Sequence, residues 1–361
     1  MKFYTCTPHA PVDSEGGSGP MMTSAGDKRT TVDIHCHMMS DRAAALARPH
    51  FTIDKEPSMA FASDLSRKVN VQQQKTVHEK LTSIDVRLAD MDAMGVDIQV
   101  ISPAPTQYYY WLEPELGRDT ARIINDDLAE CAANNSERFV ALGTVPLQHT
   151  ELAIEELNRC VNDLGLRGIE ISSHVNGEEL AQKRLEPFFA RVEELGILIF
   201  LHPLGFTEGQ RLTNHYFNNV IGNAMESTIA VSHLIFEGVL DRYPGLKICI
   251  AHGGGYLPMY TGRMDHAHSA REDCCQHIDA APSSYLAKLY FDTVIFEPDQ
   301  LDYLIKKFGA EHILLGTDYP YDMGESDPIG FIQKANDCSD EALNQMLGGN
   351  ALSLLGLTAT R

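Results

Sequence analysis

Short apolar runs alternate with amphipathic segments along most of the chain. The runs are rich in β-branched residues and carry few polar positions, which is typical of strands buried on both faces of a sheet. We predict eight such strands, at about residues 31–36, 96–102, 139–145, 166–172, 197–202, 246–252, 288–293 and 312–318.

The segments between these runs repeat their apolar positions every three to four residues, which predicts helices. We expect them at about 83–94, 119–135, 150–163, 185–196, 224–244 (one long helix or two short ones) and 298–309, with more at the C-terminal end. Ser83 suits the N-cap of the first helix and Gly95 its end.

Eight strands that alternate with helices predict a (β/α)8 barrel of the TIM type. A doubly wound open sheet is the alternative, but no glycine-rich phosphate-binding turn follows an early strand. Residues 31–361 should form this single domain, with a small insertion at about 38–80 that partly covers the site. Residues 1–30, rich in Gly, Ser, Pro and Thr, are expected to be a flexible arm.

The composition narrows the range of partners. Of the 361 residues, 43% are hydrophobic and 22% charged, which is ordinary for a globular protein, and the net charge is −21. Such a charge disfavours nucleic acid and anionic membrane surfaces as partners. No apolar run has the length of a membrane span, the N-terminus lacks the apolar core of a signal peptide, and eight scattered cysteines form no C-x-x-C pair. These features predict a cytoplasmic protein with reduced thiols.

Polar side chains that end barrel strands line one mouth of the barrel. His35 and His37 stand two residues apart at the end of the first strand, so both side chains point the same way. His202 ends the fifth strand and Asp318 the eighth. Three imidazoles and a carboxylate suit zinc, with manganese, iron or cobalt as alternatives. An open position on the metal would hold a water molecule with a lowered pKa. Cys36 should point away from the metal.

His252 ends the sixth strand and opens a run of three glycines. Lipase-type hydrolases use a similar run as an oxyanion hole, but no G-x-S-x-G nucleophile motif accompanies it here. The glycines more simply let the backbone turn sharply and leave the imidazole facing the metal. An unligated histidine there suits general acid–base chemistry. His174 follows the fourth strand by two residues, and it either contacts the site or packs in a loop.

The motifs VDIHCH, FLHP, AHGGGYLP and LLGTDYPYDMGE, together with Arg263 eight residues after Gly255, resemble the amidohydrolase superfamily. The similarity is to its decarboxylase branch, typified by 2-amino-3-carboxymuconate-6-semialdehyde decarboxylase. It runs from about residue 31 to 356.

This resemblance implies a distorted barrel, a homodimer, and a metal bound by His35, His37, His202 and Asp318. It implies that His252 activates water or moves a proton. It also implies that Arg263 reaches into the site of the neighbouring subunit and pairs with a substrate carboxylate, for which a planar guanidinium is suited.

The chain departs from the typical enzyme of this branch where substrate would be recognised. It lacks a Phe-Arg-Pro stretch whose arginine binds substrate in that branch, so Lys75, Lys68 or Arg67 could take that place. Leu204 stands where a tryptophan would follow the His-Pro pair. We therefore expect the same chemistry on a different carboxylate.

The leading hypothesis is metal-dependent, non-oxidative decarboxylation of an unsaturated or aromatic carboxylic acid. The alternative is a hydrolase or hydratase that acts through metal-bound water on a lactone, an amide or a conjugated acid. A non-catalytic barrel that binds a ligand or partner is a third possibility. His252 argues against it, because a structural metal site needs no neighbouring acid–base group.

Overall fold

A computed structural model describes residues 29–336 and 338–358. The expected flexible arm lies almost entirely outside these residues. Within the described part of the chain, no helix is both long and apolar enough to cross a membrane.

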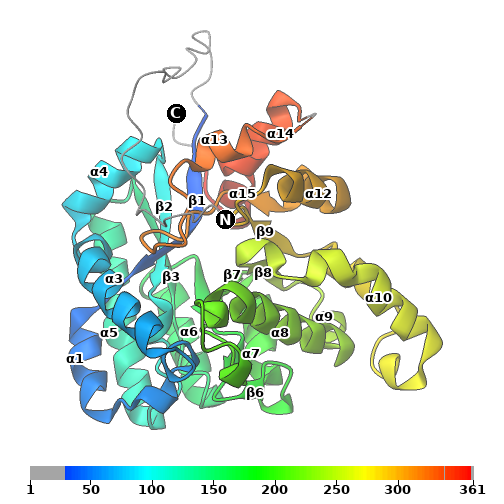
Figure 1. Cartoon of the computed structure of the whole chain (residues 1–361), viewed down its shortest axis with the longest axis horizontal. Coiled ribbons are helices and arrows are strands. Elements are labelled where there is room, and N and C mark those ends of the chain that lie inside the picture. The colour runs from blue at the N-terminus through cyan, green and yellow to red at the C-terminus, as the bar shows by residue number, and fades with distance from the viewer. Residues whose placement is uncertain (1–28, 337, 359–361) are drawn as a thin grey trace, which may run out of the picture.

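Eight parallel strands form one sheet in the order β1-β2-β3-β4-β7-β8-β9-β10 (Figure 1). They are β1 (Val32–Met38), β2 (Ile98–Pro103), β3 (Phe139–Gly143), β4 (Gly168–Ile171), β7 (Leu198–Leu201), β8 (Lys247–Ile250), β9 (Tyr290–Asp292) and β10 (Ile313–Leu314). The chain after β10 runs on beside β1 and closes the ring, because Ile34 N donates to Leu315 O and His37 N to Tyr319 O. The (β/α)8 prediction is therefore confirmed.

The helices between the strands surround this ring. They are α4 (Ile84–Met94), α5 (Pro114–Asn134), α6 (Thr150–Asn162), α7 (Glu186–Leu195), α8 (Ala224–Phe236), α9 (Val239–Arg242) and α12 (Pro298–Phe308), followed by α13 (Pro328–Ile332), α14 (Asp340–Asn344) and α15 (Asn350–Leu354). The predicted cap of α4 is present, since the Ser83 side chain accepts from Val86 N and Gly95 has a φ of 73°. The segment 224–244 forms two helices, separated at Gly238, whose φ is 70°.

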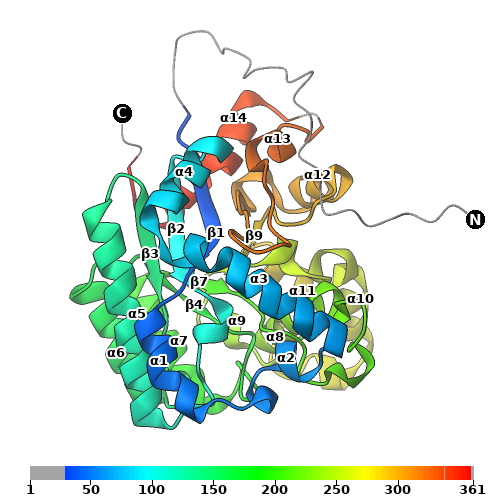
Figure 2. The same cartoon turned by 60° about the vertical axis from the view of Figure 1, so that its left-hand side comes forward.

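The segment between β1 and α4 is more helical than its sequence indicated. It contains α1 (Asp41–Ala47), α2 (Pro57–Ala60) and the 19-residue α3 (Asp64–Thr82). Only Val77 and Leu81 of α3 are buried, so its sequence shows almost no apolar periodicity. Helices α2 and α3 lie across the barrel in Figure 2 and supply side chains to the cavity described below.

Two further elements leave the barrel. The short antiparallel pair β5 (His174–Val175) and β6 (Glu178–Glu179) follows β4. Helix α10 (Leu257–Ala270) extends away from the barrel, and α11 (Pro282–Leu286) leads the chain back to β9 (Figure 1).

Candidate metal centre and active site

The two histidines of β1 point into the barrel beside Asp318. The Nε2 atoms of His35 and His37 are 3.2 Å apart, and they lie 3.4 and 3.3 Å from Asp318 Oδ1. Both imidazoles are fully buried. Asp318 reaches this place because its backbone N–H and that of Thr317 both donate to His35 O, which ties the chain after β10 to β1.

His202 and His252 complete the cluster from the ends of β7 and β8. Their ring centroids are 5.0 Å apart and lie 5.0 and 5.2 Å from that of His35. One ligand atom from each of His35, His202, His252 and Asp318 lies within 4.8 Å of the others. Both ring nitrogens of His202 are buried and have no hydrogen-bond partner in the described part of the chain.

The electrostatics of the cluster fit a bound cation. Burial, followed by the neighbouring imidazoles, holds the pKa of His202 well below its usual value, so one ring nitrogen keeps a free lone pair that can bind a metal. Burial would also lower the pKa of His35, but the carboxylates of Asp318 and Asp292 outweigh it and raise that pKa to about 10. Without a metal, a proton on His35 balances Asp318. A divalent ion would displace that proton and give His202 the partner it lacks.

The turn after β8 depends on its glycines. His252 has a φ of 57°, and Gly253, Gly254 and Gly255 also have positive φ, so the chain turns back sharply as the sequence indicated. A Cβ on Gly255 would lie 2.4 Å from Ala224 O, and one on Gly253 would lie 2.3 Å from Ile295 Cγ2. Only glycine therefore fits this close approach beside the cluster.

Asp292 is a residue of the site that the sequence analysis did not single out. Its Oδ2 lies 2.6 Å from His35 Nδ1, and its Oδ1 accepts from Gly253 N at 2.8 Å. One carboxylate thus directs His35 Nε2 toward the cluster and also holds the turn that carries His252. Asp292 could have been predicted from its position at the end of β9, because Asp318 was predicted from the end of the eighth strand in the same way.

Two further polar groups contact the Nδ1 side of the His37 ring. His37 Nδ1 lies 3.1 Å from Pro103 O, which directs its Nε2 toward Asp318. Glu170, at the end of β4, lies 3.6 Å from the same nitrogen and accepts a hydrogen bond from the Tyr108 hydroxyl. The orientation of His37 is therefore fixed by contacts within the barrel.

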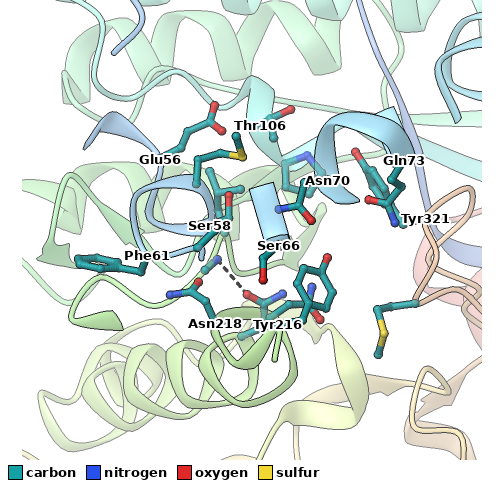
Figure 3. Close-up of a pocket in the computed structure, with 18 of the residues that line it drawn as sticks. Glu56, Ser58, Phe61, Ser66, Asn70, Gln73, Thr106, Tyr216, Asn218 and Tyr321 are labelled. Carbon is teal, nitrogen blue, oxygen red and sulfur yellow. Dashed lines mark hydrogen bonds between the residues drawn. The ribbon is translucent and has the colours of Figure 1, made fainter. Parts of the chain in front are cut away.

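A cavity of about 490 Å³ lies over the cluster. His202, His252 and Asp318 contribute to its wall. Part of the remaining wall carries neutral polar side chains from α2, α3 and the segments after β2, β7 and β10, shown in Figure 3: Ser58, Ser66, Asn70, Gln73, Thr106, Tyr216, Asn218 and Tyr321. Such a size and polarity suit a small organic substrate.

The three basic residues proposed to bind substrate differ in whether they line the cavity. Lys75 lines the cavity, whereas Arg67 donates to the carbonyls of Met59 and Ala60 and is not among the lining residues. Lys68 is exposed and is also not in the lining. Cys36 points away from the cluster, as expected, with its Sγ 3.4 Å from Val100 O.

His174 and Arg263 do not reach the cavity of their own chain. His174 lies in β5, and its Nδ1 accepts from Gly177 N at 3.1 Å, so the geometry favours packing in the loop. Arg263 is exposed on α10, outside the cavity wall. It could act only in a site other than that of its own chain.

Residues 32–357 match the sequence model of a family described as Amidohydrolase. The chain belongs to this amidohydrolase family. The resemblance expected from the four motifs is confirmed.

Among curated amidohydrolase relatives, 2-amino-3-carboxymuconate-6-semialdehyde decarboxylase of Dictyostelium discoideum is 38% identical over 274 residues, which cover 76% of each chain. The crystal structure of 5-carboxyvanillate decarboxylase from Sphingomonas paucimobilis superimposes with a TM-score of 0.82 at 25% identity and covers 92% of this chain and all of that one. A dihydroxybenzoic acid decarboxylase from Polaromonas sp. JS666, solved with manganese and 2-nitroresorcinol, has a TM-score of 0.78 at 24% identity and covers 92% and 98%.

Proposed function

We propose that this amidohydrolase is a metal-dependent, non-oxidative decarboxylase of an unsaturated or aromatic carboxylic acid. The observation that carries the proposal is the buried cluster of histidines and Asp318 in the wall of a substrate-sized cavity. The names of its relatives agree with a carboxy-lyase.

His35, His37, His202 and Asp318 would hold the metal. A divalent ion there supplies positive charge that binds an anionic substrate and stabilises the charge that develops as the carbon–carbon bond breaks. The ligand types favour zinc, while the manganese in the Polaromonas structure makes manganese the first alternative. Iron and cobalt remain further alternatives on the same ligand types.

His252 would move the proton. Its side chain is 20% exposed, it lines the cavity, and its Nε2 lies 3.7 Å from Asp318 Oδ2. When the bond to the carboxylate breaks, CO2 leaves and the bonding electron pair stays on the substrate carbon. A proton from His252 completes that carbon, and water in the open cavity returns a proton to the imidazole.

The substrate carboxylate also needs positive charge from the protein. Lys75 is the only lysine or arginine among the lining residues of the described cavity. Arg263 of a second chain would be the other source, which makes the enzyme a homodimer. Exposed apolar side chains on and near α10 support such an interface: Val220, Tyr256, Met259, Tyr260 and Phe296.

A second cavity of about 710 Å³ links this apolar surface to the site. His252 and Asp318 line it, and so do Val220, Met259 and Phe296. The cluster is therefore reached from the α10 side as well as from the insertion. A partner chain docked there would close that opening and bring its own α10 to the site, which supports a shared active site.

Hydrolysis or hydration of a lactone, an amide or a conjugated acid is the alternative use of the same residues. Release of CO2 separates the two. A cytoplasmic location is also proposed, because the buried thiols of Cys36, Cys131, Cys160 and Cys249 form no disulfides.

The test combines metal analysis of the purified chain with a screen for CO2 release. Aromatic and muconate-like acids would be offered to protein loaded with zinc or manganese, with and without a chelator. We expect one metal ion per chain and chelator-sensitive CO2 release from at least one acid. Bound metal without CO2 from any acid would favour the hydrolase or hydratase, and failure to bind either metal would refute the metal site itself.

A further inference from the structure

Glu56 is a buried carboxyl group for which the fold provides no partner. It is only 7% exposed, and its side chain makes no hydrogen bond or ion pair to any described residue. It stands directly before α2, yet it does not cap that helix. Figure 3 shows it in the cavity wall, in the part built by the insertion.

Such a group costs stability in the free protein. Burial raises the pKa of Glu56 to about 7, and no positive charge or hydrogen-bond donor compensates. Because Glu56 lines the cavity, a molecule bound there can supply the hydrogen bond that the described residues do not. If Glu56 had a purely structural role, no contact would offset this loss of stability.

The composition of the wall indicates what that ligand carries. The side chains that share this wall with Glu56 are mainly apolar or neutral and polar, such as Leu212, Ser66 and Asn70. Among the described residues that line this cavity, Lys75 is the only lysine or arginine, and it is exposed. The cavity therefore leaves the Glu56 carboxylate free to accept a hydrogen bond from a molecule bound there.

We propose that Glu56 determines substrate specificity by accepting a hydrogen bond from a hydroxyl or amino substituent of the substrate. This inference rests on the proposed function, since it assumes that an organic acid binds in this cavity with its carboxylate at the histidine cluster. Glu56 lines the same 490 Å³ cavity as His202, His252 and Asp318 of the cluster, so a molecule that fills this cavity can contact both. Glu56 is a binding residue and takes no part in the bond-breaking step.

The test measures binding without turnover. Dissociation constants would be determined by calorimetry at pH 8 on zinc-loaded protein, for benzoate and for its 2-, 3- and 4-hydroxy and amino derivatives. In the wild type, at least one derivative should bind about tenfold more tightly than benzoate, the factor that a hydrogen bond to a charged group contributes. The hydroxy and amino series show which donor the site prefers.

Glu56→Leu removes the acceptor and should reduce this preference to less than twofold, while the affinity for benzoate stays within about twofold of the wild type. Glu56→Gln keeps an acceptor without the charge and should retain an intermediate preference. Asp54→Asn is the matched control, because Asp54 is an exposed carboxylate two residues earlier that does not line the cavity. It should behave as the wild type.

Two results would overturn the proposal: a wild type that binds no derivative more tightly than benzoate, or a Glu56→Leu variant that keeps the preference. Folding is checked by the melting temperature, which should not fall in Glu56→Leu or Glu56→Gln, since both remove an unpaired buried charge. A lost preference in Glu56→Leu combined with no CO2 release from any acid would refute the decarboxylase while leaving the role of Glu56 intact.

Discussion

At the scale of single residues, replacement of His252 distinguishes proton transfer from metal binding. His252→Ala removes the acid–base group and leaves His35, His37, His202 and Asp318 in place, so we expect turnover to fall by about 10²- to 10⁴-fold with metal content unchanged. CO2 release and elemental analysis of the same preparation measure both quantities. His78→Ala, on the exposed face of α3, is the control. Loss of the metal together with turnover would instead make His252 a ligand.

The unpaired carboxyl of Glu56 also predicts how stability changes with pH. Because its pKa is raised from 4.5 to about 7, the folded protein holds this proton where the unfolded chain releases it. The wild type should therefore lose stability relative to Glu56→Gln as pH rises from about 4.5 to 7, by up to about 3 kcal/mol, with no further change above that window. Urea denaturation of both proteins across pH 4.5 to 8 measures the difference. A difference that does not vary with pH would contradict the assigned cause.

The site residues that could be predicted from the sequence are those that stand at the end of a strand. His35, His37, His202, His252 and Asp318 could be proposed because the ends of parallel barrel strands meet at one mouth, and the structure brings all five together. Glu56 could not be proposed, because its burial results from packing of the insertion over the barrel. The position of Arg263 relative to a neighbouring site depends on a second chain and stays a prediction.

At the scale of elements, the end of β9 controls two parts of the site through Asp292. Asp292→Asn should weaken zinc binding by about 10- to 100-fold, because the amide cannot replace both the His35 contact and the Gly253 contact of the carboxylate. Competition with a chelator of known affinity measures this change. Asp302→Asn, on α12 and outside both cavities, is the control. Unchanged zinc affinity would show that β1 alone orients His35.

Elements with strong apolar periodicity were predicted well, and those without it were not. The eight strands and helices such as α6 and α12 follow from local patterns. Helix α3 did not, because it lies on top of the barrel and buries only two of its 19 residues. Its polar side chains include Ser66, Asn70 and Gln73, which line the cavity. The segment whose structure was hardest to predict is therefore the one that forms much of the substrate wall.

At the scale of the whole molecule, a single chain leaves its site open toward the apolar surface beside α10. If a partner closes this opening and supplies Arg263, the His252 and Arg263 of one functional site come from different chains. Arg263→Ala and His252→Ala homodimers would each be inactive. A mixed dimer would contain one intact site, in the Arg263→Ala chain. Random exchange in an equal mixture should therefore restore about one quarter of wild-type CO2 release per chain.

Subunit exchange has to be measured in the same mixture, for which native mass spectrometry of chains with different masses is suited. Arg271→Ala provides the control, since Arg271 lies just after α10 and pairs with Asp273 on the exposed surface. That variant should be active as a homodimer. Mixed dimers that form without restoring CO2 release would mean that Arg263 does not complete the neighbouring site. In that case the positive charge for the substrate would have to come from the metal and Lys75 of one chain, and the apolar surface beside α10 would serve assembly alone.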